Sequence, residues 1–145
     1  MIKISKLADY AVVILAEMAK DSGALFNAPA LSQLIRIPEP TVSKVLKLLV
    51  RGGVLSSVRG VNGGYRLIRG AEQITVEDIV TAVDGPVAIT ACADDGIPDC
   101  SLSDSCSVRG RWDDVNTAVR AALSGVTLAD MAMDDKKIKI KEEVA

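Results

Sequence analysis

The sequence predicts a mainly α-helical fold with one small β-hairpin. Apolar residues recur at helical spacing in several segments, and the only strand-like residues form a short pair separated by glycines. A chain of 145 residues is long enough for one domain with its own core, or for a small domain plus an oligomerising arm. We expect the second of these, because a long amphipathic segment lies near the C-terminus.

The first third of the chain predicts three helices. Ser5 is a suitable N-cap for a helix that extends to about Lys20 and has one apolar face. A shorter helix is expected from about residue 28 to 35, and a proline-containing turn leads into a third helix over about 39–51. Valines and leucines form the inner side of this third helix. The polar side chains on its outer side are Thr41, Ser43, Lys44 and Lys47.

A β-hairpin is predicted directly after the third helix. Two short strands, 54–58 and 65–68, are joined by a segment that contains three glycines, and glycine permits the positive φ angles of a tight hairpin. Arg59 stands at the start of the hairpin tip and Arg66 on the returning strand. Three helices followed by a hairpin form the winged helix-turn-helix arrangement, in which the hairpin is the wing.

The second half predicts a fourth helix, capped near Thr75, and a long helix over about 108–123. The long helix carries an apolar stripe that is too extended for a helix that merely covers a small domain. We therefore expect a homodimer in which this helix packs against its copy across a two-fold axis. The alternative is a helix folded back onto its own domain. A short terminal helix is expected after Thr127.

These elements divide the chain into four segments. Residues 1–86 are expected to form a winged helix-turn-helix DNA-binding domain, and 87–107 a loop that contains the cysteines. Residues 108–132 are expected to form the dimerisation helix and the short terminal helix. Residues 133–145 are expected to form a charged, flexible tail.

Charge is distributed unevenly along the chain. Residues 1–70 carry ten Lys/Arg and four Asp/Glu, whereas residues 71–145 carry seven Lys/Arg and fifteen Asp/Glu. The basic first half predicts a polyanion partner, here a double-stranded DNA operator. In a helix-turn-helix the second helix enters the major groove, so the outer side chains of the third helix are expected to contact DNA. Arg59 and Arg66 would contact it from the wing. The alternative is an ordinary solvated helix face.

Cys92, Cys100 and Cys106 are the only cysteines and lie within fifteen residues, in a C-x7-C-x5-C pattern. Thiolates are soft ligands that suit iron–sulfur clusters, zinc and Cu(I). The chain contains no histidine, so the fourth ligand must be a carboxylate, another oxygen donor, a small molecule or nothing. The carboxylates within the loop are those of Asp94, Asp95, Asp99 and Asp104. Incomplete protein ligation favours a labile cluster over zinc, and three incidental thiols are the remaining interpretation.

The sequence argues against several classes of function. No run of eighteen apolar residues exists and the N-terminus does not have the pattern of a signal peptide, so we expect a cytoplasmic protein without a membrane partner. No nucleophile with a neighbouring base and no phosphate-binding loop are present, so neither an enzyme nor a small-molecule substrate is expected. A cluster carrier or electron-transfer protein would use the same cysteines but would leave the basic half and the wing unexplained.

The motifs, in this order, resemble the IscR/NsrR-type (Rrf-two) family of bacterial winged-helix iron–sulfur regulators. The segments that carry the resemblance are 3–13, 54–67, 79–86, the three cysteines and 123–130. Within the family the chain is similar to regulators of the SUF iron–sulfur assembly operon. The resemblance implies a dimer that represses assembly genes while it holds a cluster. We expect a 2Fe–2S cluster, with 4Fe–4S as the alternative, and a repressor that senses nitric oxide or redox state as the alternative function.

The chain departs from the IscR pattern at two places. Seven residues rather than five separate the first two cysteines, and Arg109 stands where IscR-like members carry a ligating histidine. The resemblance to NsrR-like members, which use an aspartate from the first helix of the partner subunit, instead implies Asp9 as the fourth ligand. The alternative for Asp9 is an acid that the dipole at the start of the first helix favours.

Overall fold

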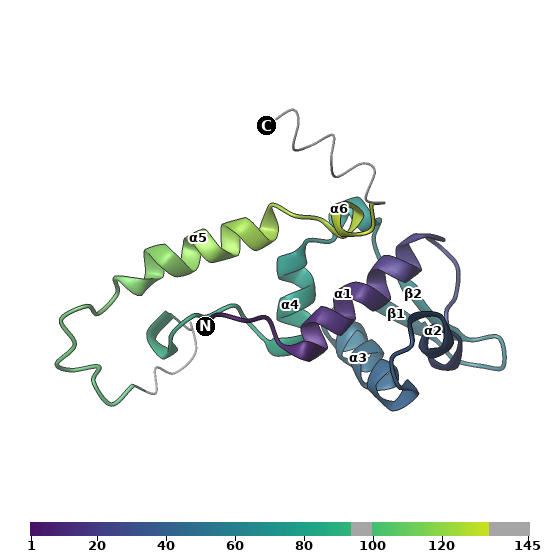
Figure 1. The fold of residues 1–145 in the computed structure, drawn as a ribbon, viewed down its shortest axis with the longest axis horizontal. Coiled ribbons are helices and arrows are strands. Elements are labelled where there is room, and N and C mark those ends of the chain that lie inside the picture. The colour runs from purple at the N-terminus through teal and green to yellow at the C-terminus, as the bar shows by residue number, and fades with distance from the viewer. Residues whose placement is uncertain (94–99, 134–145) are drawn as a thin grey trace.

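The computed structural model describes residues 1–93 and 100–133. Within these residues it contains six α-helices and one two-stranded antiparallel sheet (Figure 1). In chain order the elements are α1 (Lys6–Ala19), α2 (Ala28–Ile35), α3 (Glu39–Arg51), β1 (Leu55–Val58), β2 (Gly64–Leu67), η1 (Ala71–Gln73), α4 (Val76–Asp84), η2 (Ala91–Ala93), α5 (Trp112–Ser124) and α6 (Leu128–Met131). The predicted mainly α-helical fold with one hairpin is confirmed.

Side-chain caps explain why two of the helices begin where the sequence predicts. The Ser5 hydroxyl accepts a hydrogen bond from the backbone N–H of Ala8 at 3.1 Å and starts α1. Thr75 and Asp78 form a reciprocal capping box, with hydrogen bonds of 2.9 and 3.1 Å, that starts α4. Each cap satisfies backbone N–H groups that the first turn of a helix leaves without a partner.

The main core lies where α1 and α3 cross, and its members include Leu31 from α2 and Leu55 from β1. Leu128 of α6 also belongs to this core and is fully buried. The chain therefore returns to the first domain after α5, and the Leu128 N–H donates to the Ile74 carbonyl at 2.7 Å. The division into four segments stays a prediction. Apart from Met133, the predicted tail lies outside the described residues.

The hairpin is tied to the helices by a third backbone segment. Leu55 pairs with Leu67 in the β1–β2 register, and Phe26 bridges Tyr65 through two backbone hydrogen bonds of 2.9 and 2.8 Å. Gly64 lies so close to this bridge that an added Cβ would meet the Phe26 carbonyl oxygen at 2.6 Å. The start of β2, next to the wing tip, is thus fixed against the α1–α2 connection.

The helix predicted over about 108–123 starts later than expected. The helix α5 begins at Trp112 and spans 13 residues, whereas 108–111 form turns. Gly110 adopts a φ of +76°, which lies outside the right-handed helical region and separates Val108 from the helix. A long C-terminal helix that also includes 108–111 is therefore absent from the described residues.

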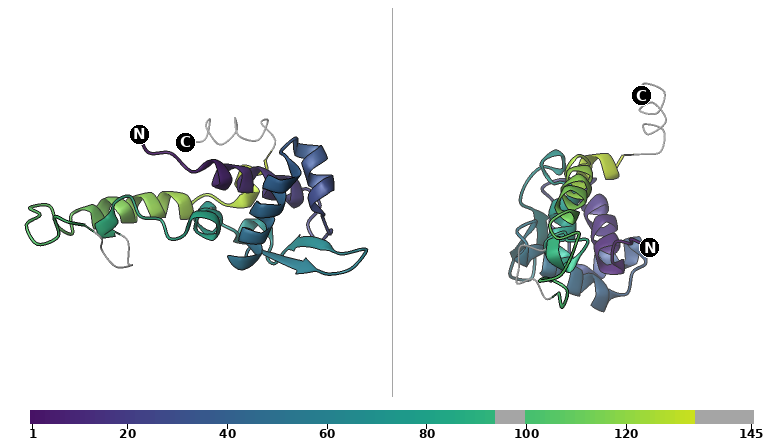
Figure 2. Two further views of the ribbon diagram at one scale, coloured as in Figure 1. Left: turned by 90° about the horizontal axis from the view of Figure 1, so that it is seen from below. Right: turned by 90° about the vertical axis from the view of Figure 1, so that its left-hand side faces the viewer.

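The helix α5 extends away from the α1–α3 core, with α4 at its base. The wing and the segment 100–111 lie at opposite ends of the long axis of the molecule (Figures 1 and 2). Across the described residues, no helix combines the length and the apolar character needed to span a bilayer. The arrangement separates two candidate sites, which are described next.

Candidate DNA-binding face and cysteine pocket

The helix-turn-helix is formed by α2, a tight turn and α3. The helix α2 ends at Ile35, and the next residue, Arg36, has a φ of 57° that redirects the chain. The Ser32 hydroxyl donates to the Ile37 carbonyl at 2.6 Å. The inner side of α3 is buried, including Val42 and Leu46. This packing determines which side of α3 faces away from the core.

The predicted DNA contacts lie on two exposed parts of this domain. On α3, Lys44 and Lys47 are exposed, and Thr41 and Ser43 are half-buried. On the wing, Arg59 and Arg66 are both exposed. Among the described residues these four cations form no ion pair, whereas Arg69 pairs with Asp78 at 3.6 Å. Unpaired cations on a helix and a neighbouring wing can neutralise phosphates without first breaking internal contacts.

The three cysteines line one pocket of about 250 Å³. All three are free thiols. Cys92 is exposed, while Cys100 and Cys106 are half-buried. The hydroxyl of Thr90 lies 3.3 Å from the sulfur of Cys92. The other residues that line the pocket are Ser103, Arg109, Gly110 and Asp113.

The donor set fits a soft metal group in chemistry, because three thiols share one small pocket. In the described residues, however, no three Cys, Asp or Glu side chains are gathered closely enough to hold a metal ion. The thiols would have to draw together around a cluster. Asp113, in the first turn of α5, is a carboxylate in this pocket that the sequence analysis missed. Its signal was its position seven residues after Cys106, beyond the loop in which acids were sought.

The predicted fourth ligand, Asp9, lies elsewhere in the chain. It is exposed on α1 and lines a different pocket with Lys3, Lys6 and Met131. A single chain therefore does not bring Asp9 to the cysteines. Of the loop acids, Asp104 is exposed and does not line the cysteine pocket. The positions of Asp94, Asp95 and Asp99 are outside the described residues.

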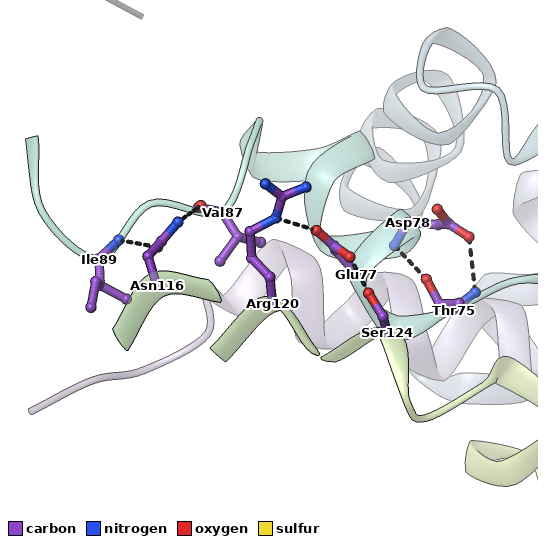
Figure 3. Close-up of polar contacts among 8 residues, drawn as sticks. All are labelled: Thr75, Glu77, Asp78, Val87, Ile89, Asn116, Arg120 and Ser124. Atoms are coloured by element: carbon purple, nitrogen blue, oxygen red, sulfur yellow. Dashed lines mark hydrogen bonds and ion pairs between the residues drawn. The ribbon is translucent and has the colours of Figure 1, made fainter. Parts of the chain in front are cut away.

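The helix α5 is joined to the rest of the chain by polar side chains spaced four residues apart (Figure 3). Arg120 donates from its Nε to Glu77 of α4 at 2.7 Å, and the Ser124 hydroxyl donates to the other carboxylate oxygen of Glu77. The hydrogen bonds from Ser124 and then from Arg120 hold the pKa of Glu77 below its ordinary value of 4.5. Glu77 is therefore ionised at neutral pH and can accept both bonds.

Asn116 belongs to the same polar stripe and is the second residue that the sequence analysis missed. In the described part of the chain it is the only buried polar residue. Its side chain bonds the backbone at Val87 and Ile89, just before the first cysteine (Figure 3). A search of the sequence for apolar residues at helical spacing misses Asn116, because a polar residue is expected on the solvent-exposed side of a helix.

The apolar stripe of α5 adjoins the polar one and is largely exposed. Trp112 and Val115 have exposed fractions of 42% and 44%, and Val119 is half-buried. A helix that buries an asparagine and exposes a tryptophan and a valine has the reverse of the usual surface-helix pattern. Exposed apolar stripes of this kind are typical of surfaces that bind a protein partner, a membrane or a ligand.

Comparison with known proteins identifies relatives over most of the chain. The sequence profile of the Rrf2 family, described as iron-dependent transcriptional regulator, matches residues 4–134. The protein aau3 of Rhizobium meliloti is 33% identical over 129 residues, which cover 89% of this chain and 84% of that protein. The transcriptional regulator IscR of Vibrio atlanticus is 31% identical over 70% of this chain, but the match spans only 57% of that protein.

Solved structures have the same fold. The global cysteine regulator CymR of B. subtilis aligns with a TM-score of 0.69 and 28% identity, covering 92% of this chain and 100% of that structure. The IscR of T. potens aligns with a TM-score of 0.63 and 27% identity, covering 90% of this chain and 85% of that structure.

Proposed function

Because this chain belongs to the Rrf2 family of transcriptional regulators, we propose that it is a repressor of iron–sulfur (SUF) assembly genes that senses iron–sulfur status through a bound cluster. Its relatives are transcriptional regulators and not enzymes. The observation that supports cluster sensing is the single pocket lined by all three cysteines. We place the activity in the cytoplasm, where a reducing environment keeps such thiols free.

On DNA, α3 would lie in the major groove and the wing beside the adjacent minor groove. Thr41, Ser43 and Lys44 at the start of α3 would face base edges and phosphates, and Lys47 would add attraction to phosphate one turn later. Arg59 and Arg66 would contact the backbone or the minor groove from the wing. The exposure of all four cations supports this orientation.

A homodimer would place two such domains on one operator. The apolar stripe of α5 supports pairing of this helix with a second copy, since Trp112 and Val115 would be removed from water there. Two recognition helices related by a two-fold axis match a palindromic site with half-sites about one helical turn apart.

The cluster would be held by Cys92, Cys100 and Cys106, with one further ligand. When bound, it supplies a redox-active and oxygen-sensitive iron centre of the 2Fe–2S or 4Fe–4S type. The chain's own contribution is to place the three sulfurs around one pocket at the N-terminal end of α5, where they would draw together on binding. Since α5 is joined to α4 through Glu77, the state of this loop can bias the orientation of the winged-helix domain.

Operator binding with and without the cluster tests this function. Anaerobically purified protein should bind a duplex selected from a random library more tightly than protein stripped of iron, at matched salt. Arg59→Ala should weaken binding by about tenfold and lower the salt dependence, because one groove contact is lost. Arg111→Ala removes the same charge at the other end of the molecule and should bind normally. Equal affinity of loaded and stripped protein would contradict cluster sensing.

Replacement of Asp9 tests the proposed ligand from the partner subunit. Asp9→Ala should accelerate cluster loss under air by about tenfold, because the fourth position would pass to solvent. The decay of visible absorbance measures this rate. The matched control is Asp21→Ala, which replaces an exposed acid in the turn after α1. If the visible absorbance of Asp9→Ala decays at the wild-type rate, Asp9 is not the ligand. Asp113 is then the carboxylate to be replaced next.

A further inference from the structure

The side chain of Asn116 fastens the segment that precedes the cysteines to α5. Its exposed fraction is 7%. Its Oδ1 accepts from the backbone N–H of Ile89 at 3.1 Å, and its Nδ2 donates to the carbonyl of Val87 at 3.1 Å (Figure 3). One amide side chain thus satisfies a backbone donor and a backbone acceptor, as a neighbouring β-strand would.

These two hydrogen bonds join the ends of the segment that carries all three cysteines. Val87 and Ile89 lie just before Cys92, and Asn116 follows Cys106 in the second turn of α5. In the folded chain the bonds close a loop whose ends are 27 to 29 residues apart in sequence. Closing a loop of this length in advance removes conformational entropy that cluster binding would otherwise have to offset.

The contact is separate from the one that docks α5 on the winged-helix domain. That docking uses Arg120 and Ser124, which bond Glu77 of α4 one and two turns further along the helix. Removal of the Asn116 amide therefore loosens the cysteine segment without breaking the link between α5 and α4. The two contacts can be tested independently.

We propose that Asn116 is a positioning residue for the cluster: its buried amide holds the segment before Cys92 against α5, so that less of the chain has to be ordered when the three sulfurs draw together around iron. This inference rests on the proposed function, since it requires a cluster in the cysteine pocket. Asn116 acts through the backbone at Val87 and Ile89 and touches no iron. Its effect is on how readily the cluster is retained.

Replacement of Asn116 tests the proposal. Asn116→Ala should lose its cluster about tenfold faster than the wild type when a ferrous-iron chelator is added anaerobically, because two hydrogen bonds that gather the loop are lost. Asn116→Asp keeps the acceptor for Ile89 but not the donor for Val87, and should be intermediate. The apo forms should also show faster amide exchange at residues 87–93. Ser124→Ala, which loosens only the contact with α4, should retain the cluster as the wild type does.

The outcomes separate this inference from the function on which it rests. A wild-type protein that binds no iron would refute the cluster and the positioning role together. A wild-type protein that holds a cluster, with Asn116→Ala releasing it at the same rate, would refute the positioning role alone. If Asn116→Ala fails to fold by circular dichroism, the comparison of Asn116→Asp with the wild type decides: equal release rates overturn the proposal, and faster release supports it.

Discussion

Replacing Cys106 by serine should yield a folded protein that no longer holds an iron–sulfur cluster. The side chain is half-buried in a surface pocket and outside the main core, so folding should be preserved. Three sulfurs already leave a four-ligand site incomplete, and a serine hydroxyl is a hard, protonated donor that does not replace a thiolate. Iron, sulfide and visible absorbance after anaerobic purification should fall to near background.

The matched control is Ser103→Ala, which alters the same pocket without removing a sulfur. It should retain iron as the wild type does. Operator affinity of Cys106→Ser should equal that of the stripped wild type, because both lack the cluster. A Cys106→Ser protein that keeps a full complement of iron and sulfide would show that the pocket is not the cluster site.

Introducing a charge on the apolar stripe of α5 should give a monomer with greatly weakened operator binding. Val115 is 44% exposed in the single chain and would be buried between two copies of α5. Val115→Lys would place an unpaired charge in that interface, at a cost of several kcal/mol. A monomer also loses the gain from simultaneous binding to two half-sites, so affinity should fall by about 10²-fold or more.

Sedimentation velocity measures the oligomeric state, and titration with the operator measures the loss of affinity. Ala121→Lys adds the same charge to an exposed position on the opposite side of α5 and should remain dimeric. Circular dichroism should show that both variants keep their helices. A Val115→Lys protein that sediments as a dimer and binds the operator normally would rule out α5 as the pairing surface.

The helices of the first domain could be predicted closely because local signals agree with packing. Ser5 and Thr75 are strong caps and begin α1 and α4 where the structure places them. The spacing of valines and leucines in α3 gave its buried side, since Val45 and Leu49 are fully buried. In these segments the residues that cap a helix and the apolar residues on its buried side can both be recognised within a short stretch of sequence.

The remaining features depend on contacts between distant residues. The start of α5 was placed too early because Val108 fits the apolar spacing, whereas Gly110 breaks the helix with a positive φ. The burial of Leu128 in the main core requires the return of the chain after α5. The role of Asn116 depends on backbone atoms 27 to 29 residues away. No periodicity within a helix contains that information.

The return of the chain to the core at Leu128 constrains the length of α5. Its C-terminal end is anchored in the core by α6, while its first turns face the sulfur-bearing segment. Insertion or deletion of one residue between these ends would rotate one relative to the other by about 100°. Homologous chains should thus preserve the number of residues in this helix.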